Sequence, residues 1–197
     1  MGLTAIFGGT FNPFHIGHYE MLSALQNDSN IEKIFIMPDR IPPHKECDFM
    51  AENDIRIEMC RIAAEDFSKA ELCLLEFERT GKSYSYDTVT ELKRKYPDTE
   101  FAFVCGGDML VFFDKWYKYE ELMKLLPFIV FKRTDTDTNL FENCIEKFSK
   151  MGMNIIIKDD IITAVSSTQI RSSFSKSRSL LPEKIYNFLS NRRVYGE

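Results

Sequence analysis

Several features that would assign this 197-residue chain to a specialised class of protein are missing from its sequence. Its 5 cysteines are odd in number and scattered, without a Cys-x-x-Cys pair, so neither a disulfide framework nor a zinc site is indicated. No apolar run approaches the roughly 20 residues of a membrane span. No basic segment precedes an apolar one near Met1, as a signal peptide would require. We therefore expect a cytoplasmic protein with no membrane partner.

An excess of positive charge is also missing. Lys and Arg number 25 against 30 Asp and Glu, which gives a formal net charge of -5. Because nucleic-acid-binding surfaces usually carry a basic stripe, we expect no nucleic acid partner. Small phosphorylated ligands remain compatible with this charge, since they need only a few local cations. The sequence leaves the oligomeric state open, a homo-oligomer included.

What is present is typical of one globular domain. Apolar residues make up 44% of the chain and charged residues 28%, which allows a sizeable core. The length fits the usual size of one domain, about 100–200 residues, and no linker, repeat or low-complexity tract divides the sequence. We expect a single domain over residues 1–197, closed by a C-terminal helical segment at about 168–195.

Short apolar segments alternate with longer amphipathic ones along the chain. The apolar segments predict strands at Leu3–Phe7, Lys33–Met37, Glu71–Leu75, Phe101–Cys105, Phe128–Phe131 and Asn154–Ile157. Helical spacing predicts helices at Gly17–Asn27, Asp54–Phe67, Tyr86–Tyr96, Tyr119–Leu126, Leu140–Met151 and Pro182–Tyr195. Loops are expected at Pro38–Asp48 and Thr134–Asn139. The alternation predicts an α/β fold in three α/β/α layers, with a doubly wound parallel sheet.

Two histidines stand where such a sheet binds its ligands, at the carboxyl end of the first predicted strand. The segment Gly8-Gly9-Thr10-Phe11-Asn12-Pro13-Phe14-His15-Ile16-Gly17-His18 follows that strand and opens a helix. The glycines let the backbone approach a ligand, and the N–H groups at a helix start favour phosphate. A metal site would need further ligands that are not nearby. The other alternative is that both histidines have only a structural role. Their position after a Gly-Gly turn, at the expected ligand crevice, makes this alternative less favoured.

A second group of polar residues, Ser166-Ser167-Thr168-Gln169-Ile170-Arg171, lies near the other end of the chain. Ser and Thr are preferred at helix starts. Their hydroxyls, the backbone donors and the arginine can converge on one anion. Taken alone, the hexapeptide is more typical of a plain helix cap with a solvated arginine.

Together, the two segments resemble the Gly-Gly-Thr-Phe-x-Pro-x-His-x-Gly-His and Ser-Ser-Thr-x-Ile-Arg signatures of the nucleotidylyltransferase superfamily. They stand in the same order and about 150 residues apart. The resemblance implies a Rossmann-like nucleotidylyltransferase fold and a direct in-line attack on the α-phosphate of ATP. It also implies Mg²⁺ that arrives with ATP rather than in a metal site of the protein. One departure is Asn12, where many bacterial relatives have Asp.

The resemblance also implies roles for individual residues. The catalytic residues would be His15, His18, Lys45 and Arg171. The ATP-binding residues would be Gly8, Gly9, Thr10, Phe11, His18, Gly106, Asp108, Arg133, Ser166, Ser167, Thr168 and Arg171. Relatives often have Arg-Pro-Gly where this chain has Arg133 followed by Thr134-Asp135, so the stacking of Arg133 on adenine stays open.

The middle of the chain bears on the acceptor. Ile41-Pro42-Pro43-His44-Lys45, Ser83-Tyr84-Ser85-Tyr86-Asp87-Thr88 and Trp116-Tyr117 resemble motifs of the nicotinate mononucleotide adenylyltransferases. That resemblance implies that ATP and nicotinate mononucleotide give nicotinate adenine dinucleotide and pyrophosphate. The implied acceptor-binding residues are Asn12, Lys45, Arg56, Ser85, Asp87, Trp116 and Tyr117. The alternatives are nicotinamide mononucleotide or phosphopantetheine as acceptor, or a nucleotide-binding regulator without catalysis.

Overall fold

In the part of the chain that the structure describes, six parallel strands form one sheet in the order β3-β2-β1-β4-β5-β6. The structure is a computed structural model, and it describes residues 2–42 and 49–196. The strands are β1 (Leu3–Gly9), β2 (Ile31–Pro38), β3 (Ala70–Leu72), β4 (Phe101–Gly106), β5 (Phe128–Arg133) and β6 (Ile155–Ile162). The chain runs outward from β1 through β2 to β3, and then returns to β4 on the other side of β1. The strand order therefore reverses at β1, which confirms the doubly wound sheet and leaves a crevice at its carboxyl end.

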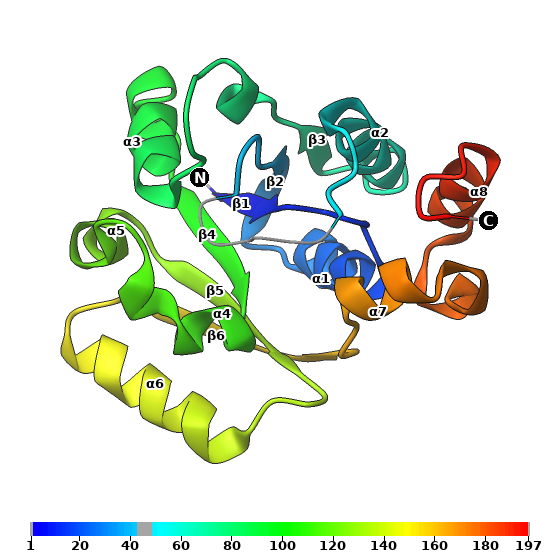
Figure 1. The fold of residues 1–197 in the computed structure, drawn as a ribbon. Coiled ribbons are helices and arrows are strands. Elements are labelled where there is room, and N and C mark those ends of the chain that lie inside the picture. The colour runs from blue at the N-terminus through cyan, green and yellow to red at the C-terminus, as the bar shows by residue number, and fades with distance from the viewer. Residues whose placement is uncertain (1, 43–48, 197) are drawn as a thin grey trace.

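Helices cover both faces of the sheet (Figure 1). One face carries α1 (Ile16–Asn27), α2 (Asn53–Ala64), α7 (Ser167–Ser172) and α8 (Glu183–Asn191). The other carries α3 (Ser85–Lys95), α4 (Gly107–Val111), α5 (Tyr119–Leu125) and α6 (Thr138–Lys150). Short 3₁₀ helices lie at Leu75–Phe77, Phe113–Lys115, Phe174–Lys176 and Arg178–Leu180. None of the helices in the described ranges is long and apolar enough to cross a membrane.

The central strands are apolar on both sides because both faces are buried. In β2, Ile34 and Ile36 belong to one core cluster, whereas Phe35 and Met37 belong to the other. Successive side chains of a strand point to opposite faces, so one continuous apolar run supplies both cores. This is the reason that strand positions could be predicted from apolar runs alone.

Several element boundaries differ from the prediction. The third strand was expected at Glu71–Leu75, but β3 ends at Leu72, and the buried Leu75 begins a 3₁₀ turn instead. The five-residue helix α4 was not predicted, because it is too short to show helical periodicity. The closing helix α8 ends at Asn191 rather than Tyr195, because Arg193 takes up a left-handed conformation with φ of 50°.

The edge strand β6 is longer than predicted and contains an irregularity. It was expected to end at Ile157 but continues to Ile162. Phe131 of β5 pairs with Lys158, whereas the next residue, Lys132, pairs with Ile161. Asp159 and Asp160 are therefore extra residues in β6 and form a bulge. These polar residues interrupt the apolar pattern, which is why the sequence predicted an earlier end.

Candidate active site

A cavity of about 710 Å³ opens at the carboxyl ends of β1 and β4, within the usual range for ligand sites of roughly 300–1,000 Å³. The two motifs from opposite ends of the chain both contribute to its wall. The residues expected to bind ligand that line it are Gly8, Gly9, Thr10, Phe11, Asn12, His15, His18, Ser85, Gly106, Asp108, Trp116, Tyr117, Arg133, Ser166, Ser167, Thr168 and Arg171. Lys45 lies outside the described residues.

Two expected acceptor contacts are not in the cavity wall. Asp87 is half-buried in the first turn of α3 and does not line the cavity. Arg56 has no exposed surface. Its Nη1 donates to the carbonyl oxygen of Thr10 at 2.8 Å and to the carboxylate of Asp39 at 3.1 Å. Arg56 is therefore placed behind the cavity wall, which its guanidinium supports, and its contact with the acceptor stays a prediction.

The two histidines lie stacked at the start of α1. Their ring centroids are 3.6 Å apart and the rings are inclined by 15°. The main-chain N–H of His15 donates to Nδ1 of His18 at 3.1 Å. Because Nδ1 of His18 accepts this hydrogen bond, the proton of the neutral imidazole is placed on Nε2. His18 is thus oriented as a hydrogen-bond donor through Nε2.

Aromatic packing holds the loop that leads to these histidines. Phe11 has a left-handed backbone with φ of 48°, which is costly for a bulky residue. Its buried ring stacks on Phe14 with centroids 4.8 Å apart, and both rings lie about 5 Å from the His18 ring. The peptide between Asn12 and Pro13 is cis. Packing of the aromatic rings thus fixes the loop and one side of the His18 ring.

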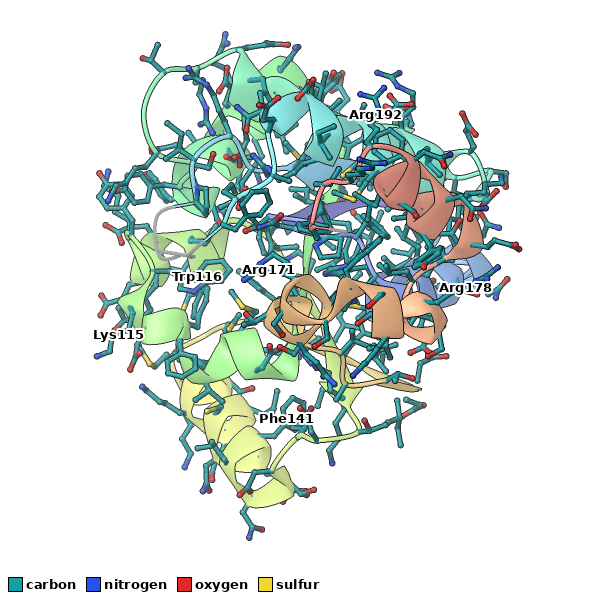
Figure 2. All side chains as sticks on the ribbon, turned by 45° about the vertical axis from the view of Figure 1, so that its right-hand side comes forward. Lys115, Trp116, Phe141, Arg171, Arg178 and Arg192 are labelled. Atoms are coloured by element: carbon teal, nitrogen blue, oxygen red, sulfur yellow. The ribbon has the colours of Figure 1, made fainter. Side chains whose placement is uncertain are left out.

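Arg171 joins the second motif to the first. Its Nη1 donates to the carbonyl oxygen of Asn12 at 2.8 Å, and its Nη2 donates to Oγ1 of Thr168 at 3.1 Å. Ser166 caps α7, since its hydroxyl accepts from the N–H of Gln169 at 3.3 Å. The plain helix cap is therefore present, but Arg171 is not simply solvated. It reaches from α7 toward the central part of the molecule, as Trp116 does from the segment after α4 (Figure 2).

Gly17 allows the two motifs to approach each other. A Cβ atom at this position would lie 2.9 Å from the carbonyl oxygen of Thr163, closer than real Cβ atoms come to backbone. Thr163 belongs to the segment between β6 and α7, on the path to Ser166. A side chain at position 17 would therefore push the second motif away from the first.

Arg133 lies at the wall beside the α4 turn. Its Nη1 donates to Asp108 at 3.0 Å and its Nη2 donates to the carbonyl oxygen of Val165 at 3.1 Å. Asp135 lies 3.6 Å from its Nε. The guanidinium is thus held at its edge by three groups. An edge-held guanidinium leaves its planar faces for stacking, so the changed Thr134-Asp135 sequence is compatible with a stacking role.

Aromatic rings surround the opposite part of the cavity. Trp116, the only tryptophan of the chain, packs against Phe103 and Phe113 with centroids 5.8 and 5.4 Å away. Trp116 is half-buried and also lines the cavity. Its side chain therefore packs in the core and also faces the space for a ligand. The rings of Tyr84 and Tyr117 lie 4.7 Å apart beside it.

Sequence reasoning missed a polar network under this part of the wall. The hydroxyl of Ser83 accepts from the N–H groups of Arg40 and Ile41, at 2.9 and 3.3 Å. Glu76 accepts from the hydroxyl of Thr88 at 2.7 Å. Burial raises the pKa of Glu76, and hydrogen bonds from Ser83 and Thr88 partly oppose this effect. Nothing in the sequence around Glu76 marks it, whereas Ser83 and Thr88 stand at the two ends of a recognised motif.

Comparisons with known proteins agree with this geometry. A family model described as cytidylyltransferase-like matches residues 6–173. The nicotinate-nucleotide adenylyltransferase of Bacillus subtilis is 34% identical over 193 residues, covering 96% of each chain. The "Probable nicotinate-nucleotide adenylyltransferase" of Listeria welshimeri is 35% identical over 192 residues, covering 98% of this chain and 96% of the relative. The chain belongs to the nicotinate-nucleotide adenylyltransferase family.

Solved structures share the adenylyltransferase fold. The nicotinic acid mononucleotide adenylyltransferase of Plasmodium falciparum, complexed with NaAD, superposes with a TM-score of 0.81. The match covers 99% of this chain and 98% of that one at 20% identity. The same Plasmodium enzyme complexed with APC gives a TM-score of 0.78. At this identity, the likeness establishes the α/β arrangement of this family member.

Proposed function

We propose that the chain joins ATP to nicotinate mononucleotide and so forms nicotinate adenine dinucleotide and pyrophosphate. The observation that carries the proposal is the meeting of the two motifs in one cavity, where Arg171 donates to Asn12 at 2.8 Å beside His15 and His18. Nicotinate-nucleotide adenylyltransferases match over nearly the full length of the chain. The described free thiols, Cys60, Cys73, Cys105 and Cys144, fit a reducing, cytoplasmic location.

The proposed reaction is one in-line displacement without a nucleophile from the protein. An oxygen of the acceptor's 5′-phosphate forms a bond to the α-phosphorus of ATP. The bond from that phosphorus to the bridging oxygen breaks, and its electron pair leaves with pyrophosphate. The chain has to align two polyanions and stabilise the charge that develops on the α-phosphate oxygens. His18 suits this task as a donor through Nε2, with His15 stacked against it.

The ATP side is assigned to the β1, β4 and α7 ends of the cavity. Gly8, Gly9, Thr10 and Phe11 would form the floor beneath the phosphates. Ser166, Ser167, Thr168 and Arg171 would hold the departing β- and γ-phosphates through hydroxyls and a cation. Gly106 and Asp108 would meet the ribose, and Arg133, which Asp108 holds at 3.0 Å, would stack on adenine. The cavity wall contains all of these residues.

The acceptor side is assigned to the aromatic part of the cavity. Trp116 and Tyr117 would pack on the nicotinate ring, and Ser85 with nearby backbone N–H groups would bind its carboxylate. Asn12 would lie near the acceptor phosphate, which Lys45 would neutralise. Because these donors match a carboxylate better than an amide, we expect discrimination between the two pyridine nucleotides.

Mg²⁺ is proposed to arrive with ATP. Within residues 2–42 and 49–196, no group of three or more His, Cys, Asp or Glu side chains could hold a metal ion. The described residues therefore fit an ion whose ligands are mainly phosphate oxygens and water. Such an ion would neutralise phosphate charge. Chelation should abolish turnover and added Mg²⁺ should restore it, and full activity after stripping would refute this part of the proposal.

The decisive experiment offers three acceptors with ATP: nicotinate mononucleotide, nicotinamide mononucleotide and phosphopantetheine. An amide would set its N–H group against donors, at a cost of about 1–3 kcal/mol for each unpaired group. Two such mismatches predict at least roughly a tenfold preference in kcat/KM for the acid. A preference for nicotinamide mononucleotide would identify the chain as a nicotinamide-nucleotide adenylyltransferase. Activity with phosphopantetheine alone would refute the role of Trp116 in acceptor binding. ATP binding without pyrophosphate release from any pair would indicate a regulator.

A further inference from the structure

The segment after α8 turns back toward the cavity. At the helix end, the N–H of Val194 donates to the carbonyl oxygen of Leu189 at 3.2 Å, and the N–H of Arg193 donates to that of Ser190 at 3.1 Å. These two hydrogen bonds and the left-handed Arg193 form a Schellman motif. Val194 packs on the same core cluster as the buried Leu189. The turn therefore gives the next residue, Tyr195, a defined direction.

The ring of Tyr195 lies between two segments that are far from it in sequence. Its centroid is 5.7 Å from that of Phe49, which precedes α2, and 5.8 Å from that of Phe174. Phe174 begins the 3₁₀ turn directly after α7. The hydroxyl of Tyr195 donates to Oδ1 of Asn12 at 2.8 Å. Tyr195 is thus in contact with three separate parts of the chain, of which Asn12 lines the cavity, although Tyr195 itself does not.

The contacts of Asn12 determine which way its amide faces. The N–H of Ala51 can only donate, so the atom 3.2 Å from it must be the oxygen Oδ1. The carbonyl oxygen of Phe49 can only accept, so the atom 2.9 Å from it must be Nδ2. Tyr195 consequently meets Oδ1 and acts as a donor. The aspartate that many relatives have at position 12 could not donate to Phe49 in this way.

Asn12 connects this junction to Arg171. The carbonyl oxygen of Asn12 accepts from Nη1 of Arg171 at 2.8 Å. Tyr195 also contacts Phe174, which lies three residues beyond Arg171 in the sequence. Tyr195 therefore restrains Arg171 from two directions, through the residue that accepts its hydrogen bond and through the turn that follows its helix.

We propose that Tyr195 is a positioning residue that holds Arg171, through Asn12 and Phe174, where its guanidinium meets the departing phosphates. The proposal rests on the proposed function for the role of Arg171. Nothing in the resemblance to known motifs assigns such a task to Tyr195. The hydroxyl is the group that links the ring to Asn12, so its removal should disturb Arg171 without emptying the space that the ring fills.

The test uses Tyr195→Phe, which keeps the ring and removes the hydroxyl. We expect kcat to fall by about threefold to tenfold, the range for one lost hydrogen bond. In the reverse reaction the KM for pyrophosphate should rise by a similar factor. Tyr186→Phe is the matched control. Tyr186 stacks on the same Phe174 at 5.2 Å, from α8, and should leave kcat unchanged.

A double-mutant cycle separates positioning from a general structural role. In an Arg171→Ala background, Tyr195→Phe should have no further effect on kcat, because the residue it positions is gone. The same fold-loss in both backgrounds would overturn the proposal. So would a wild-type kcat in Tyr195→Phe alone.

A measurement without substrates keeps the inference separate from the proposed function. Amide hydrogen exchange should be faster at Ala51 and over residues 171–174 in Tyr195→Phe than in wild type, and unchanged there in Tyr186→Phe. Wild-type protein that forms no dinucleotide would refute the proposed function, yet the exchange experiment would still test the link from Tyr195 to Asn12. Equal exchange at Ala51 in both variants would refute that link.

Discussion

Arg56 donates through Nη1 to the carbonyl oxygen of Thr10 from a position with no exposed surface. The same nitrogen lies 3.1 Å from Oδ1 of Asp39, whose side chain is 17% exposed. The second loop is held as well, since Nη2 donates to the carbonyl oxygen of Arg40 at 3.4 Å. A buried cation on α2 therefore joins the loop after β1 to the loop after β2. The two loops flank the proposed site of phosphate transfer.

Arg56→Met is expected to destabilise the fold rather than to abolish acceptor recognition alone. It removes the buried Arg56 cation from beside Asp39, and breaking a buried ion pair in this way typically costs about 3–5 kcal/mol. The free energy of unfolding from urea titration measures this loss. Asp39→Asn in the same chain should recover part of it, because the carboxylate charge that faced Arg56 is then removed. Wild-type stability with a raised KM for the acceptor would instead indicate direct contact between Arg56 and ligand.

His18→Ala should lower kcat by about 10²–10³, the usual effect of removing one donor to a developing oxyanion. His18→Asn is the sharper variant, because its amide oxygen can still accept from the N–H of His15 while no group replaces Nε2. We expect His18→Asn to unfold near the wild-type temperature and to share the low kcat. Near-normal turnover in either variant would contradict the catalytic assignment.

Arg171→Ala should raise the KM for ATP, lower kcat, or do both, while acceptor binding stays largely intact. The physical reason is that this guanidinium is assigned to the departing phosphates and holds no residue of the aromatic pocket. Separate titrations of ATP and acceptor into the variant check the assignment. If the acceptor site were lost and ATP affinity stayed normal, the two ends of the cavity would have to be exchanged.

The ion pair between Asp28 and Lys158 makes stability depend on pH. Burial alone would raise the pKa of Asp28, but hydrogen bonds from Lys158 and from the Asn30 N–H outweigh it, so the pKa is lowered from 3.8. Ionised Asp28 therefore stabilises the fold above pH of about 4, and this contribution is lost as the pH falls through the lowered value. Lys158→Met should cost about 1–2 kcal/mol at pH 7, because both side chains are mostly buried.

Urea denaturation of Lys158→Met and wild type at several pH values measures this difference. It should shrink steadily below pH 4, as Asp28 becomes protonated in both proteins. If the difference in the free energy of unfolding stayed constant down to the lowest pH measured, Lys158 would act through packing of its hydrocarbon chain instead.

The sheet and the histidine loop could be predicted because their signals are local. The apolar run of β1 ends in Gly8-Gly9, and His15 and His18 follow at a helix start, so one short segment contains the evidence. The position of Arg56 could not be predicted, since its partner Thr10 lies 46 residues away. Tyr195 meets Asn12 over 183 residues, a pairing that only the folded chain creates.

The bulge in β6 lies on an edge strand of the described sheet. β6 ends the described sheet, and Ile157 and Ile161 expose 48% and 65% of their surface there. A regular apolar edge strand is a template for pairing with another chain, and so for aggregation. Asp159 and Asp160 interrupt that template between the two isoleucines and would bring like charges together if two such edges aligned. We therefore expect these two aspartates to disfavour edge-to-edge pairing of β6 with a second copy, a task unrelated to the chemistry of the cavity.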